Sequence, residues 1–121
     1  MRDHTKLKAF QLADQLVLSI YKATRDFPSE EKFGMVAQMR SAALSIPSNI
    51  VEGCARNTEK DYLRFLDIAH GSARELEYQI SVARRLGLMK SDTGSALELS
   101  SIEVSKVING LIKSLRDSTR K

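Results

Sequence analysis

The sequence contains few of the residues that cross-link a fold or break its elements. It has one cysteine, two prolines, six glycines and no tryptophan in 121 residues. The single cysteine, Cys54, excludes a disulfide within the chain and is typical of a reducing compartment. So few prolines and glycines leave room for few turns, which favours a small number of long elements.

Long apolar runs and recognisable catalytic motifs are also missing. No stretch approaches the ~18 apolar residues of a membrane span, and the segment 1–5 lacks the apolar core of a signal peptide. We therefore expect a cytoplasmic protein with no membrane partner. The chain has no glycine-rich phosphate loop, no serine nucleophile elbow and no Cys/His zinc spacing. We expect no enzyme, no metal and no cofactor.

What the chain does contain favours helices. Leu, Ala, Lys, Glu, Arg and Ser dominate, with 42% hydrophobic and 28% charged residues. Apolar residues recur at steps of three and four in segments of about 6–25, 30–56, 59–86 and 92–116. The short connections between them predict one all-α domain over 1–121, an antiparallel up-down-up-down four-helix bundle.

The segment 59–86 has the most regular pattern and clear boundaries. Thr58 is the expected N-cap, with Asp61 three residues later, and Gly87 is the expected left-handed residue after the last turn. Small residues at its middle permit close approach of a neighbouring helix. The expected neighbour is the second helix around Ala42 and Ser45.

The second helix carries an unusual cluster around a proline. Pro47 lacks an N–H and interrupts an apolar period that continues on both sides, so the helix is predicted to be bent or irregular there. We expect Asn49 and Glu52 to satisfy backbone groups freed by the proline or to bond to the third helix. Antiparallel pairing is expected to bring Arg40 toward Glu75 and Glu77. The motif is interpreted as structural, with the members Arg40, Pro47, Asn49, Glu52 and Gly53.

Other candidates for chemistry have simpler explanations. Cys54 has no partner motif and is interpreted as a buried structural residue. His70 follows Asp67 by three residues, as in di-iron bundles, but those sites need a second such pair and two more carboxylates. His70 is therefore expected on the surface or between subunits.

The charge is basic, with 19 Lys and Arg against 15 Asp and Glu, a net charge of +4. Cationic residues gather near the ends of the expected helices, and a solvated surface is the default explanation of each group. If an oligomer repeats one group around an axis, the summed field becomes a phosphate-binding surface. The residues so predicted are Arg56, Lys60 and Arg64 at the second junction, Arg84 and Arg85 at the opposite end, and Lys113 and Arg116 near the C-terminus. The N-terminal segment adds Arg2, Lys6 and Lys8.

The central stretch from Gln38 to Gly53 reads Q-M-R-S-A-A-L-S-I-P-S-N-I-V-E-G. It resembles the signature Q-[IL]-R-x-A-x-x-S-I-x-x-N-I-[AV]-E-G of the four-helix proteins encoded in intervening sequences of bacterial 23S ribosomal RNA genes. Flanking segments at 27–34, 62–77 and 108–115 are similar as well. The resemblance covers about residues 6–116 and departs at Cys54, Ala55 and Arg74.

The resemblance implies a four-helix bundle that assembles into a homopentameric ring. The family is similar to the accessory protein of diversity-generating retroelements, a basic pentamer that associates with a reverse transcriptase and nucleic acid. It assigns no catalytic residues. Our leading hypothesis is therefore a non-enzymatic oligomeric module that binds RNA or DNA. The alternative is an adaptor that holds another protein, with the charge serving only solubility.

Overall fold

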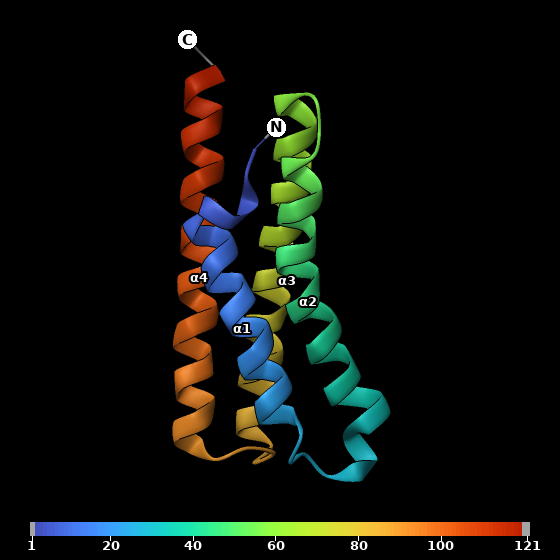
Figure 1. The fold of residues 1–121 in the computed structure, drawn as a ribbon. Helices are drawn as coiled ribbons and strands as arrows, with labels where there is room; N and C mark the ends of the chain where they lie inside the picture. Colours follow the sequence, from blue (N-terminus) through green and yellow to red (C-terminus); the bar gives the residue numbers. More distant parts are fainter. Residues whose placement is uncertain (1, 120–121) are drawn as a thin grey trace.

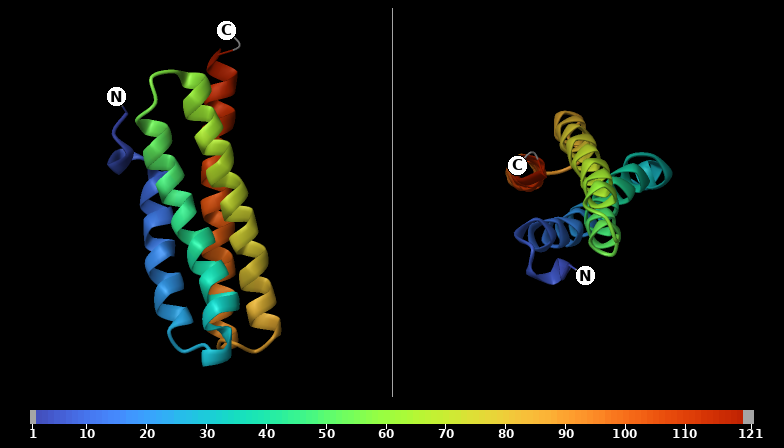
Figure 2. Two further views of the ribbon diagram at one scale, coloured as in Figure 1. Left: turned by 90° about the vertical axis from the view of Figure 1, so that its right-hand side faces the viewer. Right: turned by 90° about the horizontal axis from the view of Figure 1, so that it is seen from above.

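The computed structural model describes residues 2–119, and all the regular structure of these residues is helical. Four long helices follow one another: α1 (Lys8–Thr24), α2 (Ala37–Cys54), α3 (Glu59–Arg85) and α4 (Ser91–Thr119). Consecutive helices run in opposite directions side by side (Figure 1), and Figure 2 shows the bundle from the side and from above. The predicted all-α four-helix bundle is confirmed.

The segment before α2 differs from the single helix predicted over 30–56. It forms a 3-10 helix, η2 (Ser29–Glu31), and a π-helix, η3 (Lys32–Val36), before α2 begins. Gly34 in the π-helix is a weak α-helix former, which favours irregular geometry there. α2 then continues as an α-helix through Pro47. The irregular geometry therefore precedes α2, and a bend at Pro47 stays a prediction.

Both predicted boundaries of α3 are confirmed. Thr58 Oγ1 accepts a hydrogen bond from the Asp61 N–H at 3.1 Å, which satisfies one of the free donors of the first turn. At the other end Gly87 has φ +74°, and the Leu88 N–H donates to the Ala83 carbonyl at 3.0 Å. This left-handed closure turns the chain sharply toward α4.

The core is formed by one apolar row from each helix. Each of its large side chains contributes on the order of 1.5–3 kcal/mol by leaving water. Those with essentially no exposed surface include Ile20, Met39, Ile46, Ile50, Leu66, Leu76, Ile80 and Ile108. Within residues 2–119, no helix has the length and hydropathy needed to cross a membrane.

α2 and α3 approach each other closely, as the small residues predicted. A Cβ added to Gly53 would lie 3.0 Å from Phe65 Cβ and 3.3 Å from the Tyr62 carbonyl oxygen. Further along the pair, Ser45 Oγ and Ser72 Oγ share a hydrogen bond of 2.8 Å. The close contact positions the N-terminal half of α3, which carries most of the candidate site described next.

Candidate nucleic-acid interface

One end of the bundle gathers cationic side chains from three parts of the chain. The N-terminal arm, the connection from α2 to α3 and the C-terminal part of α4 meet there (Figure 1). The Arg2 guanidinium donates to the Arg56 carbonyl at 3.2 Å, which ties the arm to the connection. Lys60, Arg64 and Arg116 line a shared surface hollow. We call Arg2, Arg56, Lys60, Arg64 and Arg116 the cationic end.

Aromatic rings hold three of these guanidinium groups. Arg56 and Arg64 lie 5.3 and 4.6 Å from the centre of the Phe65 ring. Arg2 lies 4.1 Å from the centre of the Tyr62 ring. Cation–π contacts of this kind contribute about 0.5–1 kcal/mol each at exposed sites and fix the orientation of a guanidinium. The cations are thereby preorganised as well as clustered.

Carboxylates neutralise part of this charge. Arg56 pairs with Glu52, Arg64 lies 3.9 Å from Asp61, and Arg116 lies 2.8 Å from Asp67. The partners are largely exposed, and exposed pairs of this type are worth only about 0.2–1 kcal/mol. A phosphate group can therefore compete for the guanidinium groups. Among the described residues, Lys60 forms no ion pair.

The remaining predicted contacts are divided between the two ends of the bundle. Lys113 is on α4 one turn before Arg116, whereas Arg84 and Arg85 lie apart from the cationic end. Arg84 Nε is 3.1 Å from Glu98 Oε1, and its stem packs against Gly94, so it ties α3 to α4. Arg85 Nε donates to the carbonyl and hydroxyl of Ser81 within its own helix. Lys113 is exposed on α4. Arg84 and Arg85 lie at the C-terminal end of α3, so they cannot join the cationic end within one copy.

The polar motif of α2 makes contacts that differ from the predicted ones. Arg40 faces α1: its Nε donates to Thr24 Oγ1 at 2.9 Å, and Nη2 donates to the Tyr21 carbonyl at 3.2 Å. The predicted approach of Arg40 to Glu75 and Glu77 on α3 was wrong. Periodicity shows which residues leave the core face, whereas the reach of a long side chain decides which neighbour it meets.

Asn49 bonds within α2 and Glu52 bonds to the connection that follows it, so neither bonds to α3. The Asn49 amide donates to the Ser45 carbonyl at 2.8 Å and to Ser45 Oγ at 3.0 Å. Glu52 pairs with Arg56 one turn later. The carbonyl that Pro47 leaves without its helical donor belongs to Ala43. Asn49 instead bonds to the Ser45 carbonyl, two residues further along α2. The expectation that these residues satisfy the Ala43 carbonyl or bind α3 was wrong, and their structural role is local.

The reactive groups beneath the cationic end are buried. Cys54 is 1% exposed, and burial raises the pKa of its thiol. Burial, with Cys54 as a neighbour, raises the pKa of Tyr62 to about 12. Both groups are neutral near neutral pH, which confirms the interpretation of Cys54 as a buried structural residue. Within residues 2–119, no three His, Cys, Asp or Glu side chains are grouped to hold a metal ion.

The comparison with protein families agrees with this architecture. The model of the 23S rRNA-intervening sequence protein family matches residues 5–110, most of the chain. The chain belongs to this family. The resemblance noted in the sequence between Gln38 and Gly53 is thereby confirmed.

Solved structures include a relative of the same fold. A protein with unknown function from Bacteroides thetaiotaomicron, described as from a ribosomal protein family, is 24% identical with a TM-score of 0.80. The alignment covers 87% of this chain and 95% of that chain. At this identity the likeness shows the fold alone. No curated protein matches the chain.

The stacked arrangement at the cationic end was missed in the sequence. Tyr62 belongs to the apolar row of α3 and is 3% exposed, so its position in the sequence marks it as a core residue. The signal was present in the spacing, because Arg64 and Phe65 are adjacent and Arg56 lies across a short connection. The contribution of Arg2 had no such signal, since the path of the N-terminal arm depends on the whole fold.

Proposed function

We propose that this chain is a non-enzymatic oligomeric module that binds nucleic acid through its cationic end. The observation that carries the proposal is the set of three guanidinium groups stacked on Tyr62 and Phe65, with Lys60 beside them. Guanidinium groups bind phosphate oxygens in a bidentate manner, and preorganised ones lose less entropy on binding. The family's link to ribosomal RNA genes makes RNA the first ligand to test.

Assembly of several copies fits an uncharged face on α2. We call Ala37, Ser41, Leu44, Ser48 and Val51 the outer stripe. They recur at steps of three and four, all are exposed, and none is charged. Leu44 is 49% exposed, and Phe33, just before the stripe, is 89% exposed. A helix face of small and apolar residues suits packing against a helix of another copy.

Oligomerisation strengthens the electrostatic part of the proposal. One copy carries a net charge of only +4, and carboxylates offset part of the cationic end. A closed ring, as in the pentamer implied by the resemblance, repeats the cationic end around its axis. The phosphate backbone then meets several copies at once, and each neutralised phosphate releases counterions.

The test is a salt titration of RNA binding with charge variants. Fluorescent single-stranded RNA is titrated with wild-type protein and with a Lys60→Gln, Arg64→Gln variant at several salt concentrations. We expect weaker binding and a salt slope reduced by about 0.7 for each lost phosphate contact. Lys106→Gln is the matched control, because Lys106 is an exposed lysine in the middle of α4. Equal affinity of the wild type and the charge variant, with assembly intact, would contradict the proposal.

The adaptor alternative is favoured by a different observation. Large apolar side chains are exposed outside the outer stripe, including Leu18 at 67%, Tyr78 at 67% and Leu99 at 70%. Such residues fit a protein partner better than an RNA. A stable partner that survives nuclease treatment and is lost on Leu18→Ser or Leu99→Ser would favour the adaptor.

A further inference from the structure

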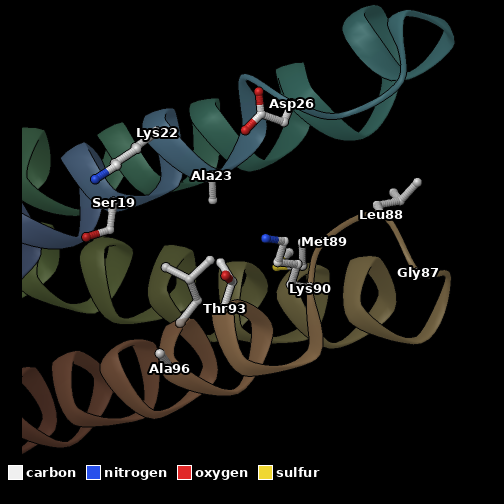
Figure 3. A pocket seen from close by; sticks show the side chains of 11 residues that line it. Ser19, Lys22, Ala23, Asp26, Gly87, Leu88, Met89, Lys90, Thr93 and Ala96 are labelled. Atoms are coloured by element: carbon white, nitrogen blue, oxygen red, sulfur yellow. The ribbon is translucent and has the colours of Figure 1, made fainter.

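A hollow opens at the end of the bundle opposite to the cationic end. It has a volume of about 780 Å³ and lies between the C-terminal part of α1 and the start of α4 (Figure 3). The turn from α3 to α4, residues 87–90, closes one side of it. We call it the end hollow.

Small side chains on both walls create the end hollow. Ser19 and Ala23 line it from α1, while Thr93 and Ala96 line it from α4. Large residues at these positions would fill the space between the two helices, as interdigitating side chains do in the core. The floor is apolar, with Leu97 buried and Met89 half-buried. The hollow thus offers an apolar surface of the size that holds small ligands, roughly 300–1,000 Å³.

The end hollow also has charged side chains at its exposed edge. Lys22 and Lys90 line the end hollow with one carboxylate, Asp26. Among the described residues, neither lysine forms an ion pair, even though Asp26 is one turn from Lys22. The hydroxyls of Ser19 and Thr93 add further donors at the rim (Figure 3). The local charge is positive, and its donors remain available to an anion.

We propose that the end hollow binds a small anionic amphiphile, a carboxylate joined to an apolar chain. The chain lies against Ala23, Met89 and Leu97, and the carboxylate lies within reach of Lys22 and Lys90. An inorganic anion would leave the apolar floor in water, and a cationic amphiphile would meet two ammonium groups. Within residues 2–119, no aromatic ring lines the hollow, so it offers no stacking surface for a nucleotide base. The proposal is independent of nucleic-acid binding at the other end.

The experiment compares two probes that share a chain and differ in head group. Calorimetric titration of the full-length protein uses decanoate and decyltrimethylammonium, each below its micelle concentration. We expect saturable binding of decanoate with one site per chain and binding of the ammonium probe at least about tenfold weaker. No saturable binding of decanoate, or equal binding of the two probes, overturns the proposal.

Variants locate the binding. Lys22→Gln with Lys90→Gln is expected to weaken decanoate binding about tenfold, because a charge-assisted hydrogen bond is lost. Ala96→Leu keeps the charge but fills the hollow from an exposed position, and it should abolish binding in a folded protein. Lys106→Gln is the control for general charge and should bind as the wild type does. Wild-type affinity in Ala96→Leu would place the ligand elsewhere and overturn the assignment.

Discussion

The two ends of the bundle carry similar kinds of charge but organise them in opposite ways. At the cationic end, Tyr62 and Phe65 fill the space beneath the cations and hold the guanidinium groups. At the end hollow, Ala23 and Ala96 leave the space open, and the lysines lie over it. Under the two proposals together, the side-chain volume beneath a charged surface decides whether the surface suits an extended polyanion or a small enclosed ligand.

The largest effect is expected from a substitution at Gly53, which tests the close packing beneath the cationic end. Gly53→Ala places a methyl group 3.0 Å from Phe65 Cβ and 3.3 Å from the Tyr62 carbonyl oxygen, so α2 and α3 must separate at the cationic end. We expect a loss of about 1–3 kcal/mol in the free energy of unfolding, measured by urea denaturation. Gly71→Ala is the matched control: its added Cβ meets nothing within 4 Å. This control should be stabilised by about 1 kcal/mol, and equal effects of the two would refute the packing argument.

High pH is expected to lower the free energy of unfolding because Tyr62, beneath the cationic end, loses its proton. Burial raises the pKa of Tyr62 from 10.0 to about 12, so the folded state keeps a proton that the unfolded state loses. The stabilisation is complete below pH 10 and is lost as the pH rises toward 12, by on the order of 1–2 kcal/mol. Denaturation of wild type and Tyr62→Phe across this range measures the effect. A parallel decline in both proteins would show that another group is responsible.

The start of α3 is capped by a threonine side chain, whereas the start of α4, beside the end hollow, is not capped by Thr93. Thr58→Ala removes the acceptor of the Asp61 N–H, and we expect a loss of about 1 kcal/mol in the free energy of unfolding. In the first turn of α4, the Asp92 carboxylate and not the Thr93 side chain accepts the hydrogen bond from the Thr93 N–H. The comparison variant is Thr93→Ala. It should change stability little. A larger loss at Thr93 than at Thr58 would reverse the expected contrast.

The smallest effects are expected from the ion pairs of the two ends. Glu98→Gln breaks a partly buried pair with Arg84, and Asp67→Asn breaks an exposed pair with Arg116. Both should cost less than about 1 kcal/mol, with the larger loss at Glu98, because solvent and salt screen the exposed pair more. Repeating the denaturation in high salt checks this, since the Asp67 effect should diminish first.

The sequence was sufficient to predict features set by residues that are close together in the chain or on consecutive helices. The Thr58 cap and the Gly87 turn are confirmed because both are set by a few consecutive residues. The pairing of small residues on α2 and α3 is confirmed by the bond between Ser45 and Ser72. The cap and the turn require no knowledge of how distant helices are aligned, whereas the serine pair follows from the antiparallel pairing of two consecutive helices.

What could not be predicted depends on that alignment. Arg40 was assigned to α3 and bonds to α1, because its side chain can reach either neighbour. The end hollow requires Ala23 and Ala96 to line one space, although they lie on the first and last helices. The stacking of Arg2 on Tyr62 likewise joins residues far apart in the chain. None of these three arrangements leaves a periodic trace in the sequence.

The hydrogen-bonded series from Asn49 through Ser45 to Ser72 has a consequence for redesign. It crosses the α2–α3 interface at one height, so sliding either helix by a turn would separate the two hydroxyls. We expect replacement of the three residues with alanine or leucine to leave the melting temperature unchanged or raised and to permit several alignments of the helices. We expect the series to select one alignment of the helices at some cost in stability, so a transplanted bundle would need to keep it.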